Sequence, residues 1–339
     1  MQLSRPQSRE GKRQLARDVT VRWDNAFARC YKLVAFIVNR PLPARPASGE
    51  GKEGANAGST AYRFNREGLM KTTLFASLLL ASTVLAVGAA AAQPFPFNEA
   101  GVTNGHWHLN SKDVAANEKI FVGMGGKAFQ AGGRHRVLFP GVMIILDGAP
   151  GAPPPTGPTQ GSVVNHVGFI VNNVQEQVTK WKAAGVPVEP GNNGRLDQAY
   201  VNTPDGLRIE ILENKNQSMP IQSEHVHFFL PEAAIPQSQA WYGKTFGAKA
   251  GQRNNAPVAD IPGVQLRFNK AETAQAPTKG RILDHIGFDV KDLKAFIKTL
   301  EANGIKLDRP YTVNDIGVGI AFVTDPWGTY IEINERPPQ

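Results

Sequence analysis

The stretch PTQGSVVNHVGF at residues 158–169 recurs as PTKGRILDHIGF at residues 277–288, which is 119 positions further along the chain. Repetition at a fixed distance is the sequence signature of a duplicated unit. We therefore expect two copies of one unit, at residues 103–215 and 222–336.

Each copy divides again into two modules. Every module begins with a short apolar strand that carries a histidine, and these residues are His106, His166, His225 and His285. A helical pattern that ends at a glycine follows each of these strands, and strand-like stretches with turn signals come next. The pattern predicts an α+β chain of four βαβββ modules.

The module openings HVGFIV and HIGFDV, together with the closings TPDGLRIEILE and DPWGTYIEINE, resemble the vicinal oxygen chelate (VOC) superfamily. This superfamily includes glyoxalase I, the extradiol ring-cleaving dioxygenases and the bleomycin-resistance proteins. The resemblance covers residues 105–335. It implies that the modules pair into two tandem VOC half-open barrels, each curled around a metal ion, and it fixes the function far less than the fold.

The resemblance also implies metal ligands on the first and last strands of the modules. Grouped by copy, the implied ligands are His106, His166 and Glu210 in the first copy, and His225, His285 and Glu332 in the second. Two histidines and one carboxylate form the ligand set of non-haem Fe(II) oxygenases. We therefore expect a divalent metal, Fe(II) first, with Mn, Zn or Ni as alternatives.

A fourth ligand is missing from both copies. The corresponding position falls near Met143 or Ile144 in the first copy and near Gln265 or Leu266 in the second. Glyoxalase I uses four protein ligands, so this difference counts against a glyoxalase activity.

Two further residues are catalytic candidates. Tyr200 precedes Glu210 in YVNTPDGLRIE, which is similar to an extradiol-dioxygenase ending whose tyrosine binds substrate; the second copy has Phe322 instead. The acid–base histidine of those enzymes has no counterpart, because residues 167–224 contain no histidine. His108 lies two residues from His106, on the same strand face. We expect it to serve as a base in place of the missing histidine, or else to be a structural neighbour of the metal site.

Charge excludes a nucleic-acid partner. The chain has 37 Lys and Arg residues against 29 Asp and Glu, but residues 72–339 carry 23 of each. A neutral body lacks the basic face that phosphate binding requires. The partner that we expect is a small molecule.

The basic excess lies before and within a signal-like segment. Residues 70–92 begin with Met-Lys, continue as an apolar run and end in alanines, which is typical of a secretory signal peptide. Residues 1–69, which contain the single cysteine, have no sustained periodicity and are interpreted as a mistranslated or disordered extension. We expect a periplasmic or secreted protein; the alternative is an uncleaved membrane anchor.

Three functions remain open. The first hypothesis is an extradiol-dioxygenase-like oxidoreductase that acts on a small molecule with vicinal oxygens. The alternatives are a glyoxalase-like lyase or isomerase, and a metal-free protein that binds a small molecule as the resistance proteins do.

Overall fold

The computed structural model describes residues 95–148 and 152–336. The expected signal peptide at 70–92 and the extension at 1–69 lie outside the described residues. Within the described ranges, no helix is both long and apolar enough to cross a membrane.

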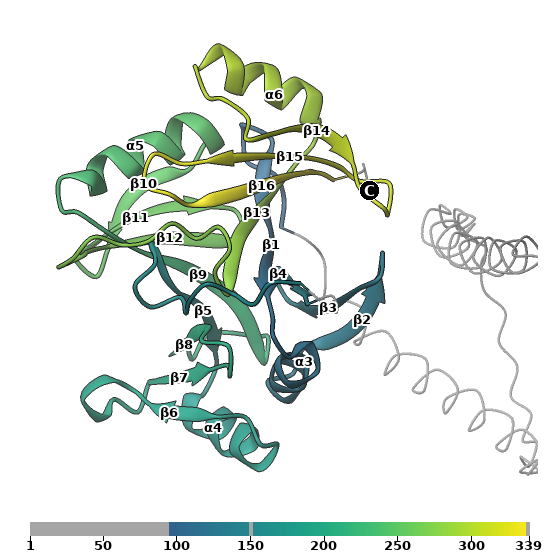
Figure 1. Cartoon of the computed structure of the whole chain (residues 1–339). Helices are drawn as coiled ribbons and strands as arrows, with labels where there is room; N and C mark the ends of the chain where they lie inside the picture. Colours follow the sequence, from purple (N-terminus) through teal and green to yellow (C-terminus); the bar gives the residue numbers. More distant parts are fainter. Residues whose placement is uncertain (1–94, 149–151, 337–339) are drawn as a thin grey trace, which may run out of the picture. The chain divides into compact units, whose positions relative to one another are not determined.

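The described chain contains four modules, each with one α-helix (Figure 1). The first comprises β1 (Val102–Asn110), α3 (Val114–Gly123), β2 (Lys127–Ala131), β3 (Arg134–Phe139) and β4 (Val142–Asp147). The second comprises β5 (Val164–Val171), α4 (Val174–Ala183), β6 (Val188–Pro190), the 3-10 turn η2 (Asn192–Gly194), β7 (Gln198–Asn202) and β8 (Arg208–Glu213).

The third module comprises β9 (Ile221–Leu230), α5 (Ala234–Phe246), β10 (Lys249–Arg253), β11 (Ala256–Ile261) and β12 (Val264–Lys270). The fourth comprises β13 (Leu283–Val290), α6 (Leu293–Ala302), β14 (Arg309–Val313), β15 (Gly319–Thr324) and β16 (Tyr330–Glu335). The predicted α+β fold of four βαβββ modules is confirmed.

Side-chain caps define the starts of three helices. Asp113, Asn173 and Asp292 each accept a hydrogen bond from the backbone N–H three residues further on, at the starts of α3, α4 and α6. Such a cap satisfies one of the N–H groups that a helix start leaves unpaired. Each helix packs against strands of its own module.

The modules pair into two eight-stranded sheets, and the pairing crosses the two sequence copies. One sheet has the order β14-β15-β16-β13-β1-β4-β3-β2, so it joins the fourth module to the first. The other has the order β10-β11-β12-β9-β5-β8-β7-β6, so it joins the third module to the second. We call them the 1–4 sheet and the 2–3 sheet. The copies expected at 103–215 and 222–336 therefore do not coincide with the sheets.

Strand alternation separates the core from the histidines. On β1, Trp107 is fully buried and its ring lies 5.3 Å from that of Phe169 on β5, so apolar side chains of the two sheets share one core. Successive side chains of a strand point to opposite faces. His106 and His108 therefore lie together on the face of β1 that Trp107 does not occupy.

Candidate metal sites

Two glycines fix where the strands of different copies meet. In the antiparallel seams, Gly168 on β5 lies opposite His225 on β9, and Gly287 on β13 lies opposite His106 on β1. A Cβ atom on either glycine would overlap the facing imidazole ring. The motifs HVGF and HIGF thus provide room for a histidine of the other copy.

The first cluster consists of His106, His108, His285 and Glu332, from β1, β13 and β16. The Nε2 atoms of His285 and His106 lie 2.8 and 3.3 Å from Oε2 of Glu332. His108 packs beside His285, with 4.4 Å between the ring centroids. One atom from each of the four residues lies within 4.8 Å of all the others, which is close enough for a single ion.

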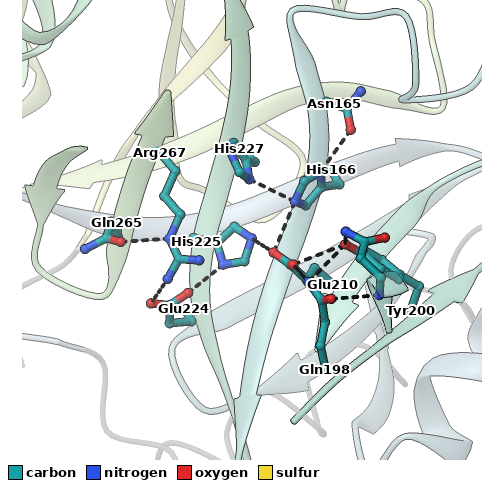
Figure 2. A network of polar contacts seen from close by, with 11 residues as sticks. Asn165, His166, Gln198, Tyr200, Glu210, Glu224, His225, His227, Gln265 and Arg267 are labelled. Carbon is teal, nitrogen blue, oxygen red and sulfur yellow. Dashed lines mark hydrogen bonds and ion pairs between the residues drawn. The ribbon is translucent and has the colours of Figure 1, made fainter. Parts of the chain in front are cut away.

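The second cluster consists of His166, Glu210, His225 and His227, from β5, β8 and β9 (Figure 2). The Nε2 atoms of His225 and His166 lie 3.1 and 3.3 Å from Oε2 of Glu210. His227 Nδ1 lies 2.9 Å from His166 Nε2. The second cluster repeats the composition of the first: three histidines and one glutamate.

The grouping of the ligands by copy is wrong. His106 lies with His285 and Glu332, not with His166 and Glu210, because the first module pairs with the fourth. By the same pairing, His225 lies with His166 and Glu210 in the second cluster. Each cluster takes its glutamate and one histidine from one module and its remaining histidines from a module of the other copy. The role of these residues as metal ligands stays a prediction.

In three of the histidines, Nδ1 makes a hydrogen bond to the side chain of the preceding residue. Nδ1 of His285 lies 2.6 Å from Asp284, Nδ1 of His225 lies 2.5 Å from Glu224, and Nδ1 of His166 lies 2.9 Å from Asn165; the last two pairs appear in Figure 2. Metal-binding histidines typically donate this second N–H to such a group, which directs the other nitrogen toward the ion. Sequence reasoning missed these partners, although the dipeptides Asp-His, Glu-His and Asn-His were the available signal. His106 follows Gly105 and has no such partner.

Both glutamates are held in their ionised form. Burial alone would raise the pKa of Glu332 and of Glu210, but the neighbouring histidines outweigh it and lower both values. Burial lowers the pKa of His108 and of His166 to about 4, and that of His227 to about 2. At neutral pH the first cluster therefore combines an anionic carboxylate with a neutral His108, and the second combines one with a neutral His166 and His227; these are the protonation states that metal binding needs.

The pKa values of two further histidines shift in the opposite direction. Burial disfavours the charged forms of His285 and His225, but hydrogen bonds to their carboxylate neighbours raise both pKa values. A cation bound at Nε2 in place of a proton would satisfy Glu332 beside His285 and Glu210 beside His225.

The residues fit a divalent metal. Both ring nitrogens of His106 and Nε2 of His225 are buried and make no hydrogen bond within the described residues, although a carboxylate oxygen lies 3.1–3.3 Å from an Nε2 atom of each. A buried nitrogen without a partner is costly. Imidazole and carboxylate together suit Fe(II), Mn, Zn and Ni. An ion bound to Nε2 of His106 in the first cluster and to Nε2 of His225 in the second would remove this cost at both atoms.

The two catalytic candidates lie in different clusters. Tyr200 Oη lies 3.3 Å from Glu210 Oε1 in the second cluster, whereas His108 belongs to the first, where its Nε2 lies 3.5 Å from Asp147. The two candidates therefore do not share a cluster, although both lie in the first sequence copy. The residue of the second cluster that corresponds to His108 is His227.

Tyr200 is part of a buried polar group around Glu210. Its hydroxyl accepts hydrogen bonds from Asn192 (2.8 Å) and Gln198 (3.1 Å), and Gln198 also donates to Glu210 Oε1. Burial raises the pKa of Tyr200, so this hydroxyl stays protonated at neutral pH. The contacts place Tyr200 against the ligand carboxylate.

The position of a fourth ligand differs between the clusters. Met143 pairs with His106 in the parallel β1–β4 ladder, and Gln265 pairs with His225 in the β9–β12 ladder. Gln265 donates to Asp260 and accepts from Arg267, so both ends of its amide are engaged. Neither residue supplies a free oxygen ligand.

A cavity of about 420 Å³ opens beside the first cluster. His108, His285 and Glu332 line it, together with Arg136 and Phe322. Phe322 lies opposite Glu332, as Tyr200 lies opposite Glu210 in the other sheet. The first cluster thus adjoins a space that can hold a small molecule.

Comparison with known proteins agrees with this architecture. Residues 225–333 match the family model described as the Glyoxalase/Bleomycin resistance protein/Dioxygenase superfamily. A search of curated proteins finds no match.

Solved structures show the same fold. Glyoxalase I from Zea mays is 16% identical, with 69% of this chain and 92% of that chain covered and a TM-score of 0.53. A Bacillus subtilis protein whose name proposes a dioxygenase activity is also 16% identical, with coverages of 70% and 86% and a TM-score of 0.53. At these identities the likeness concerns the fold alone. Residues 225–333 match the glyoxalase/bleomycin resistance/dioxygenase (VOC) superfamily, and the repeated modules and paired sheets give the described chain the fold of these solved structures, with its unit present in tandem.

Proposed function

We propose that the protein binds a divalent metal, Fe(II) first, and acts as an extradiol-dioxygenase-like oxidoreductase on a small molecule with two neighbouring oxygens. The observation that carries this proposal is the first cluster, where His106, His285 and the ionised Glu332 offer two histidines and one carboxylate, and a cavity adjoins His285 and Glu332. Met143 stands at the fourth position, so coordination sites would remain open for substrate. A bound metal would supply a Lewis acid and a site for dioxygen.

The residues of the chain would position the substrate and accept its proton. His108 has a pKa of about 4 because of its burial, so it is neutral at pH 7, and its Nδ1 makes no hydrogen bond within the described part of the chain. Its Nε2 faces Asp147, which fixes the ring. We propose that Nδ1 of His108 accepts a proton from a substrate hydroxyl in the cavity.

One observation favours a second candidate function. His108 and His227 lie close enough to the other three residues of their clusters to act as fourth ligands. Four protein ligands would suit a glyoxalase-like lyase or isomerase, which needs no dioxygen. The segment at 70–92 supports the further proposal that the protein acts in the periplasm or outside the cell.

Two assays separate these functions. We expect the Fe(II)-loaded protein to consume oxygen with catechols and to leave the α-protons of hydroxyketones unexchanged. Proton exchange without oxygen uptake would favour the lyase or isomerase instead. If the protein takes up no metal, neither enzyme proposal holds and the metal-free binding protein is the remaining hypothesis.

A further inference from the structure

The cavity beside the first cluster contains a buried arginine without a carboxylate partner. Arg136 on β3 is 4% exposed and lines the same cavity as His285 and Glu332. Its Nη1 donates to the backbone carbonyls of Ala131 and Arg134. Its Nε is buried and makes no hydrogen bond, and no ion pair joins its guanidinium to a carboxylate of the described chain. Burying a cation without an opposite charge is costly.

In the 2–3 sheet, the arginine of the equivalent strand pair forms an ion pair with a glutamate. Arg136 on β3 lies opposite Ile145 on β4, whereas the equivalent pair in the 2–3 sheet is Val258 on β11 opposite Arg267 on β12. The arginine thus lies on β3 in the 1–4 sheet, but in the 2–3 sheet it lies on β12, the partner of the equivalent strand β11. Arg267 lies 2.5 Å from Glu224, which is its counterion.

The 1–4 sheet has lost that counterion. Gly105 occupies the position in the first copy that corresponds to Glu224 in the second, as the alignment of GHWHL with EHVHF shows. Arg136 therefore has a positive charge beside a candidate metal cluster and lacks the carboxylate that accompanies Arg267.

Other charged residues in the cavity are largely paired with each other. Arg134 lies 3.1 Å from Asp147, and Arg336 lies 3.0 Å from Asp289. Arg136 is the buried arginine of this lining without an ion pair among the described residues, and the carboxylate that attracts it, Glu332, is already engaged by His106 and His285. An anionic ligand is the missing partner.

We propose that the first cluster takes substrates that carry an anionic group, a carboxylate or a phosphoryl group, in addition to their two neighbouring oxygens. This inference rests on the proposed function, since the neighbouring oxygens would face the metal ligands while Arg136 binds the anionic group. The planar guanidinium presents parallel N–H donors that match such groups. The second cluster, with Val258 at the equivalent position, has no such recognition element.

Calorimetric titration of the metal-loaded protein with matched probes tests the inference. We would compare 3,4-dihydroxybenzoate with catechol for the carboxylate, and dihydroxyacetone phosphate with dihydroxyacetone for the phosphoryl group. We expect the wild-type protein to bind at least one anionic probe about tenfold or more tightly than its neutral counterpart, as a charge-assisted pair does. Equal binding of both pairs would overturn the inference.

Variants assign the preference to one side chain. Arg136→Val introduces the residue found at position 258 and should abolish the preference, while Arg136→Lys keeps the charge, loses the planar fork and should reduce it several-fold. Arg195→Val, at an exposed arginine paired with Asp197, is the control and should leave it unchanged. A preference that survives in both Arg136 variants would contradict the inference.

Metal content measured on the same samples separates the two proposals. If wild-type protein holds no metal, the proposed function fails. If it holds metal and shows no anionic preference, only the role of Arg136 fails.

Discussion

In the second cluster both oxygens of the glutamate are engaged, whereas in the first only one is. Glu210 meets two histidines through Oε2 and meets Gln198 and Tyr200 through Oε1. The contacts of Glu332 all go to Oε2, because Ile320 and Phe322 replace the glutamine and the tyrosine. Both clusters have the same candidate ligands in different surroundings, so we expect a tightly held metal in the second cluster and the reaction in the first.

The largest expected effect comes from removing each glutamate. Glu332→Ala and Glu210→Ala should each remove one metal per chain, because each leaves buried histidines without their anion. Turnover should be lost in Glu332→Ala alone, since the cavity adjoins the first cluster. Metal analysis and oxygen uptake check this, and loss of turnover only in Glu210→Ala would reverse the roles of the clusters.

A methyl group added at Gly168, opposite His225, should lower the stability of the protein. In Gly168→Ala the added methyl group would overlap the ring of His225, and we expect the free energy of unfolding to fall by about 1–3 kcal/mol, as in overpacked cores. The metal of the second cluster should weaken while that of the first stays. Gly251→Ala on β10 is the matched control, because its methyl group would meet only ordinary contacts. Chemical denaturation measures both, and equal effects would refute the role of Gly168.

The residues that hold the Nδ1 atoms should tune affinity for the metal. Asp284→Asn should weaken the first site and Glu224→Gln the second, each by roughly 10–100-fold, because the ring loses its orienting carboxylate. Competition with a chelator measures both affinities. An Asp284→Asn variant that weakens the second site instead would contradict the assignment of His285 to the first cluster.

The smallest effect concerns the tyrosine that distinguishes the clusters. Tyr200→Phe reproduces Phe322 and should destabilise the protein by about 1 kcal/mol through lost hydrogen bonds, with both metals retained. Thermal unfolding measures the change. If Tyr200→Phe abolished turnover, the second cluster would be the reaction site and Tyr200 would contact the substrate.

The sequence predicts the modules but not their partners. The recurrence of HVGF and HIGF, together with strand and helix periodicity, is sufficient for four βαβββ units. Which units pair is decided by long-range strand contacts, such as His106 opposite Gly287 and Gly168 opposite His225, which leave no local pattern. The six ligand candidates came from the family resemblance and stay a prediction, and their grouping by copy was wrong for this reason. Asp284 and Glu224 could have been found from their position beside a histidine.

Metal content of two double variants tests the central claim, that each site is shared between the copies. His106→Ala/His285→Ala removes two residues of one cluster, and His106→Ala/His166→Ala removes one residue from each. From a wild-type content of two metals per chain, we expect the first double variant to keep one metal and the second to keep none. If the first kept none and the second kept one, the sites would lie within the copies and the account would be wrong.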